Sequence, residues 1–78
     1  METIPLSQIE AGQAAVVEEV RGHGIVPQRL LEMGIIRGTL VEVIRFAPMG
    51  DPIDIRIKGY HLSLRREEAS HIRVSVRK

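Results

Sequence analysis

Imidazole and carboxylate side chains are the groups in this sequence that could bind a metal ion or move a proton. The chain has three histidines, His23, His61 and His71, and no cysteine. No two of these histidines have the i, i+4 spacing that places a pair of imidazoles on one helical face in zinc sites. We therefore interpret all three as surface histidines, and we expect neither a metal site nor a bound cofactor.

Two carboxylates, Asp51 and Asp54, lie three residues apart around a predicted turn, where they could bind a hard cation. The segment lacks the repeated oxygen ligands of a calcium loop. An aspartate beside glycine and proline commonly fixes a turn by hydrogen bonding to its own backbone. We expect Asp51 to have that role.

Motifs of phosphate-binding and nucleophilic enzymes are missing. The segment 21–24 follows a predicted strand and precedes a predicted helix, where a phosphate-binding loop would lie, but it has no Walker lysine and no third glycine. The serines, Ser7, Ser63 and Ser70, stand in no nucleophile-elbow sequence. We expect a protein that works by binding and is not an enzyme.

The bulk composition indicates one small domain over residues 1–78. Hydrophobic residues make up 44% of the chain and aromatic residues only 3%, so the core must be aliphatic. We expect the only two rings, Phe46 and Tyr60, to lie in or near that core. A net charge of +1 and no free aromatic platform argue against nucleic-acid binding.

No apolar run approaches the roughly 20 residues that cross a bilayer. The opening residues 1–5 have neither the basic nor the apolar region of a signal peptide. We therefore expect a cytoplasmic protein with no direct insertion into a membrane.

Hydrophobic periodicity predicts a mostly β fold with one short α-helix. The alternating or β-branched runs that predict strands are 13–20, 41–43, 53–57, 62–64 and 72–76. The imperfect alternation in the first run suggests a bulge. One-turn helices are predicted at 5–9 and 65–69. About five strands without a long helix favour a small closed barrel, because closure removes exposed sheet edges.

The segment 25–33 is the one convincing helix, and Gly34 stands where a left-handed residue would end it. The residues after it, Ile35 and Ile36, can be core or surface. Three apolar residues of the helix share one face, which we expect to lie on the core: Val26, Leu30 and Met33.

Two apolar side chains are expected to be exposed. Leu31 points away from the core face of the helix, and Met49 lies on a loop whose two prolines limit its freedom. An exposed aliphatic side chain ringed by polar groups is typical of a small transient interface, and methionine adapts readily to a partner. We expect Leu31, with Arg29 and Met49, to contact a protein partner.

Several segments together resemble the FeoA family. The run 29–35 followed by Gly38 resembles the helix-and-turn signature of that family. The strand and loop at 41–43 and 47–52 resemble its next elements. The final hairpin and turn are matched by Gly59, 62–65 and 68–69, and the usual opening by 5–9 with Gly12. The resemblance covers nearly the whole chain in order and spacing.

This resemblance implies a small SH3-like β-barrel that serves bacterial ferrous iron uptake. Proteins of the family are understood to act on FeoB, a membrane permease with a cytosolic G domain. The same barrel occurs as the C-terminal domain of DtxR-type metal-dependent repressors. The implied role is a cytosolic accessory protein that contacts an FeoB-like permease and is recruited by it to the inner face of the membrane, with weak or metal-bridged self-association left open.

Two alternative functions stay open at this point. The first is a metal-sensing or effector-binding barrel that uses one of the histidines and nearby carboxylates as ligands. The second is a GTPase-activating partner with an arginine finger, for which Arg29 and Arg37 are the candidates.

Overall fold

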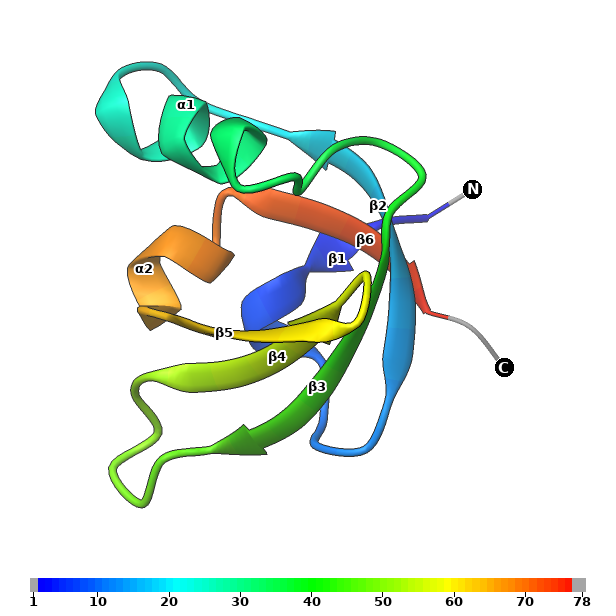
Figure 1. Cartoon of the computed structure of the whole chain (residues 1–78), viewed down its shortest axis with the longest axis vertical. Helices are drawn as coiled ribbons and strands as arrows, with labels where there is room; N and C mark the ends of the chain where they lie inside the picture. The colour runs from blue at the N-terminus through cyan, green and yellow to red at the C-terminus, as the bar shows by residue number, and fades with distance from the viewer. Residues whose placement is uncertain (1, 77–78) are drawn as a thin grey trace.

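The computed structural model describes residues 2–76 as a curved antiparallel sheet with helices at its margins (Figure 1). The elements are β1 (Ile4–Pro5), the 3₁₀-helix η1 (Leu6–Gln8), β2 (Ala14–Val20), α1 (Ile25–Glu32), β3 (Leu40–Phe46), β4 (Ile53–Ile57), β5 (Tyr60–Leu64), α2 (Arg66–Ala69) and β6 (Ile72–Val76). The predicted strands, the helix at 25–33 and both one-turn helices are confirmed, with shifts of a few residues at their ends. Within residues 2–76, no helix is long and apolar enough to cross a membrane.

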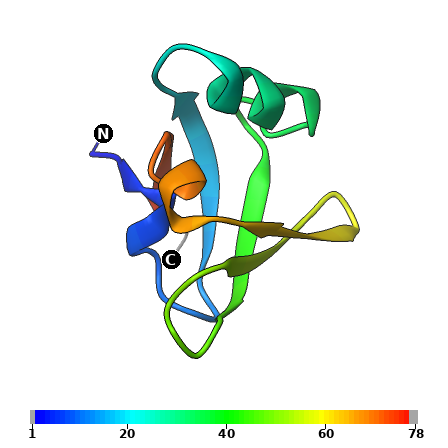
Figure 2. The same ribbon diagram turned by 90° about the vertical axis from the view of Figure 1, so that its left-hand side faces the viewer.

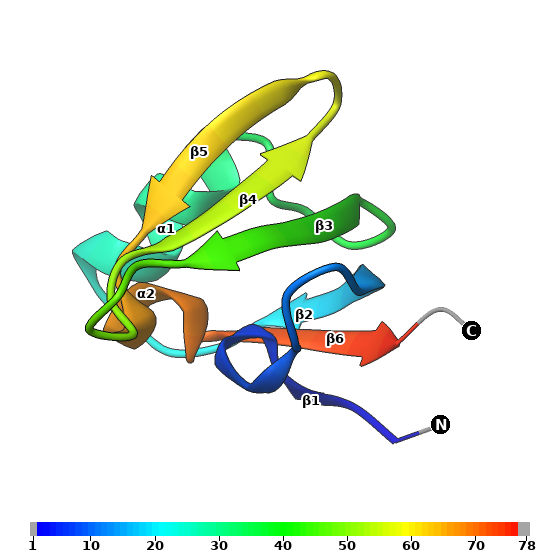
Figure 3. The ribbon, with the colours of Figure 1, turned by 90° about the horizontal axis from the view of Figure 1, so that it is seen from below.

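The strand order is β1-β6-β2-β3-β4-β5, and every neighbouring pair is antiparallel. Figure 3 shows the strands in this order, with β5 and β1 at opposite ends. The two-residue β1 was not predicted from the sequence. We expected a closed barrel, but β1 and β5 do not pair, so the sheet does not close completely. The helix α2 contacts both η1 and α1. The strand β5 therefore has a strand neighbour on one side only.

Two register shifts bend the sheet. One lies in β2 between Val17 and Glu19, where the imperfect alternation predicted a bulge. The other lies in β3 between Val43 and Arg45, and no sequence pattern indicated it. Because an extra residue on one strand increases local bending and twist, these shifts let a short sheet wrap around its own core.

The core consists of aliphatic side chains from alternate strand positions, joined by residues of the helices. Val26 and Met33 are half-buried and pack against it, and Leu30 is fully buried, so the predicted core face of α1 is confirmed. Ile35 is buried and Ile36 is exposed. The residues of the hydrophobic core cluster are Leu6, Ile9, Ala15, Val17, Leu30, Ile35, Val41, Val43, Ile53, Ile55, Ile57, Leu64, Ala69, Ile72 and Val74.

The two aromatic rings differ in their relation to this core. Phe46 is half-buried and packs against the core, as expected. Tyr60 is 42% exposed, so its expected place in or near the core is wrong. It opens β5 beside the hairpin turn, and its hydroxyl donates a hydrogen bond to the carbonyl oxygen of Met33. A phenol needs such a partner, and the end of α1 supplies one at the edge of the barrel.

The end of α1 has the two hydrogen bonds of a Schellman motif. The N–H of Gly34 donates to the carbonyl of Leu31 at 3.0 Å, and the N–H of Ile35 donates to that of Leu30 at 3.1 Å. Gly34 has φ +92°, which confirms the predicted left-handed residue. Leu30 and Ile35 are both buried, so the motif also directs the chain back into the core.

We expect Gly34→Val to lower the free energy of unfolding by more than about 1 kcal/mol, because a β-branched residue is strained at positive φ. A Cβ here would meet only Lys58 Nζ and Tyr60 Oη at 3.8 Å, so the cost is conformational rather than steric. Chemical denaturation measures the loss. Gly34→Asn is the matched control and should lose less, since asparagine tolerates this conformation. An unchanged stability for the valine variant would contradict the assignment.

Candidate functional site

The outer face of β3, β4 and β5 carries rows of polar side chains. In the first row, Arg45 Nε lies 2.8 Å from Asp54 Oδ2, and Ser63 Oγ donates to Asp54 Oδ1 at 2.7 Å. The hydroxyl of Ser63, and then the guanidinium of Arg45, hold the pKa of Asp54 below its usual value. Both oxygens of Asp54 are thus already engaged, and Asp51 shares neither partner. The two aspartates do not form a cation site together.

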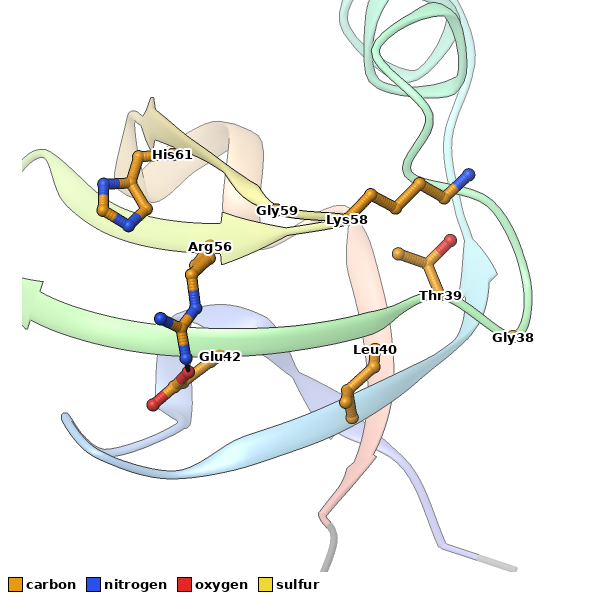
Figure 4. A pocket seen from close by; sticks show the side chains of 8 residues that line it. All are labelled: Gly38, Thr39, Leu40, Glu42, Arg56, Lys58, Gly59 and His61. Carbon is orange, nitrogen blue, oxygen red and sulfur yellow. Dashed lines mark hydrogen bonds and ion pairs between the residues drawn. The ribbon is translucent and has the colours of Figure 1, made fainter.

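The second row contains Glu42, Arg56 and His61, and it borders a hollow of about 670 Å³ (Figure 4). Arg56 forms an ion pair with Glu42, while Lys58 extends away from that pair and Leu40 lies at the other side of the hollow. The hollow is shallow and mixes cationic with apolar groups. The hydroxyl of Thr39, which lines the hollow, donates to the carbonyl oxygen of Gly34 and accepts from the N–H of Ile36.

The three histidines occupy unrelated settings. His23 is exposed in the loop before α1, and His61 is exposed on β5. His71 Nδ1 lies 3.0 Å from the carbonyl oxygen of Arg21, so its ring is held by the backbone. In the part of the chain that the structure describes, no group of three histidine, aspartate or glutamate side chains could hold a metal ion.

Asp51 has a role that its local sequence did not predict. Its Oδ1 accepts a hydrogen bond at 3.0 Å from the backbone N–H of Arg66, at the start of α2, so the expected bond to its own turn is wrong. The first N–H groups of a helix have no partner within the helix, and this carboxylate supplies one. The Arg66 guanidinium returns a hydrogen bond to the carbonyl of Gly50 at 3.0 Å and lies over the ring of Phe46. The loop 47–52 is thereby tied to α2.

Two of the three predicted partner-binding residues are exposed aliphatic side chains, as expected. Leu31 is 48% exposed on α1, and Met49 is 92% exposed on the loop between β3 and β4. Arg29 is also exposed, but it lies on the wall of a groove that neither Leu31 nor Met49 lines. Arg37 is exposed in the turn after α1 and does not line that groove either.

The groove of about 630 Å³ lies between α1, the end of β5, the loop 47–52 and α2. Its lining residues are Arg29, Met33, Asp51, Pro52, Ser63, Leu64, Arg65 and Glu68. Sequence reasoning missed it because four separate segments form its walls. It also missed Ile25 and Leu40, which are 74% and 55% exposed. Leu40 directly precedes Val41, whose side chain faces inward, and adjacent side chains of a strand point to opposite faces. This alternation could have revealed the exposure of Leu40.

Comparison with known proteins first gives a family match. The family model of the FeoA domain matches residues 4–76. A Porphyromonas gingivalis protein described as an Fe(2+) transport protein A/Fe(2+) transporter FeoB fusion protein is 42% identical over 71 residues. The match covers 91% of this chain and 8% of that relative, so the chain spans only a small part of the relative's length.

Solved structures agree with this match. The FeoA-like protein from Clostridium acetobutylicum has a TM-score of 0.92 and 39% identity, covering 97% of this chain and 88% of that one. Stenotrophomonas maltophilia FeoA complexed with zinc, described as a prokaryotic SH3 domain protein, has a TM-score of 0.80 and 28% identity, covering 96% and 91%.

A manganese-dependent transcriptional repressor has a TM-score of 0.89 at 15% identity and covers 99% of this chain and 42% of that chain, which shows a shared fold alone. The expected likeness to regulators of the DtxR type and the expected SH3-like fold are thereby confirmed. Since the family model spans nearly all of the sequence, the chain belongs to the FeoA domain family.

Proposed function

We propose that this chain is a non-catalytic accessory protein of ferrous iron transport that works by direct contact with the cytosolic part of an FeoB-like permease. The observation that carries the proposal is the relative in which an Fe(2+) transport protein A and an FeoB transporter form one polypeptide. Fusion keeps two parts at high effective concentration, which favours even a weak contact between them. Such a partner would bring the chain to the inner face of the membrane.

The surface of the chain fits a binding role. Leu31 projects from α1 between the exposed neighbours Arg29 and Glu32, while its neighbour Leu30 is buried in the core. Burying the exposed part of an aliphatic side chain against a partner contributes about 25 cal/mol for each Å². Charged neighbours keep the free surface soluble and surround the contact once it forms. We therefore propose that Leu31 contacts the permease.

The proposal is tested by co-purification of the chain with the FeoB-like permease from the same genome. We expect the wild-type chain to be retained by the tagged permease in detergent. We also expect ferrous iron uptake to fall when the chain is deleted and to return when it is supplied again. Normal uptake without the chain, together with no retention by the permease, would rule out the proposed function.

The first variant is Leu31→Asp, which should leave the fold nearly intact because the side chain is exposed. An acidic group in the last turn of a helix costs about 0.3–1 kcal/mol through the helix dipole. We expect this variant to lose retention by the permease and to reduce iron uptake.

Ile25→Asp is the matched control, since it places the same charge at a more exposed position of α1 and should bind normally. If Leu31→Asp unfolds, the side chain serves the core after all. If it stays folded and binds like wild type, α1 does not provide the contact.

A further prediction concerns metal binding, and it distinguishes an accessory protein from a metal sensor. Because no three ligands converge in residues 2–76, we expect no submicromolar one-to-one binding of ferrous ion to the monomer. Anaerobic calorimetry with ferrous and zinc ions measures this. Any weak binding should rise with protein concentration, because it would bridge surface histidines and carboxylates of different chains. Tight stoichiometric binding at low protein concentration would instead favour the sensor.

A further inference from the structure

The hairpin of β4 and β5 fixes which backbone groups of β5 face outward. Its two turn residues, Lys58 and Gly59, have φ of 44° and 85°, and Ile57 pairs with Tyr60 across the turn. Positive φ at both positions is the type I′ turn of two-residue hairpins, in which the flanking pair exchanges both hydrogen bonds. The antiparallel alternation then points the N–H and C=O groups of His61 and Ser63 away from β4.

This outward side of β5 lacks the usual protection of a sheet edge. No strand pairs with it, and no turn or loop hydrogen bond in residues 2–76 involves the backbone of 61–63. Natural edges are commonly blocked by proline, lysine, a bulge or very short length. The opposite end, β1, has only two residues, one of them Pro5. β5 has five residues without proline, lysine or register shift.

The groove described above borders the C-terminal end of this open edge. Its lining includes Met33 at the end of α1 with Ser63 and Leu64 from β5. Figure 2 shows the ribbon of β5 passing below that of α1. Leu64 is only 1% exposed, so the floor of the groove takes its apolar surface from the half-buried Met33. A strand added to β5 would lie about 4.8 Å from it and could place alternate side chains on that floor.

The walls of the groove carry two guanidinium groups and two carboxylates. The carboxylates already present are engaged by backbone donors: Glu68 Oε1 accepts from the N–H of Arg65 at 2.8 Å, and Asp51 from that of Arg66. No ion pair in residues 2–76 involves Arg29 or the guanidinium of Arg65. Two arginine side chains on the groove walls are thus available to an incoming carboxylate.

We propose that β5 binds an extended segment of a partner protein as an added strand, with apolar side chains at alternate positions and a carboxylate facing Arg29 and Arg65. The backbone groups of His61 and Ser63 supply the hydrogen bonds, while Met33 contacts an apolar side chain of the segment. The proposal rests on the proposed function only in taking the permease as the source of that segment.

The test compares Ser63→Pro with Ser63→Ala. Both changes remove the hydroxyl that bonds Asp54, but only proline removes the outward N–H, and proline is tolerated on a sheet edge. The probe is a seven-residue peptide of alternating valine and threonine that ends in aspartate. Two further peptides carry N-methyl groups on the valines or on the threonines.

We expect the unmodified peptide to shift amide signals of 61–65 and of Arg29 and Met33 in the wild-type chain. Ser63→Pro should weaken binding about tenfold, and Ser63→Ala should change it less than about twofold, because one backbone hydrogen bond is lost only in the first. One of the two methylated peptides should bind about tenfold more weakly. If Ser63→Pro fails to fold, the methylated peptides still decide the question on the wild-type chain.

Absence of peptide binding at millimolar concentration, shifts confined to another surface, or equal binding of all three peptides would each overturn the added strand. Co-purification with the permease is the last experiment of this test. If the permease retains the wild-type chain and Ser63→Pro equally, the permease does not use this edge, and the added segment belongs to another protein. If wild type is not retained while the peptide results hold, the proposed function fails and the binding edge stands.

Discussion

Packing of aliphatic side chains from the inner face of one short, curled sheet is the constraint on which the rest of the structure depends. The chain has no cysteine and only two aromatic rings, so neither disulfides nor large rings can compensate for a small core. Every inward position of β4, Ile53, Ile55 and Ile57, is buried as a result. Substitution at these positions would leave a cavity or a clash, and the molecule has no spare inward position in β4 for a ligand.

The same constraint determines where binding can occur. Since the interior of β4 and its neighbours is filled, a partner must use the outer face of the sheet, the helix surfaces or a strand edge. The outer face is occupied by the rows of Arg45 with Asp54 and of Arg56 with Glu42, whose charges already satisfy one another. Exposed pairs of this kind contribute little to stability, but a partner would have to desolvate them to bind there. No ion pair in residues 2–76 involves a residue of α1 or β5.

Local patterns predicted the parts of the fold that depend on neighbouring residues. The alternation at 53–57 and 72–76 and the helix ending at Gly34 are set within a few residues, so the sequence alone indicated them. The remaining features depend on contacts between distant segments. The bond between Asp51 and Arg66 spans fifteen residues, and that from Tyr60 to Met33 spans twenty-seven. The groove could not be predicted for the same reason, whereas the exposure of Leu31 could, because it follows from helical periodicity.

The two binding proposals meet on α1, whose side chains serve different surfaces. Leu31 lies on the solvent side, while Arg29 and Met33 line the groove beside β5. A partner segment in the groove would therefore contact the face of α1 next to the one that Leu31 presents. The Schellman motif holds the end of this helix against the core through Leu30 and Ile35, so both faces keep a fixed geometry relative to β5. Because this support is already formed in the free chain, binding on either side requires little ordering of the backbone, and preorganisation of this kind lowers the entropic cost of association.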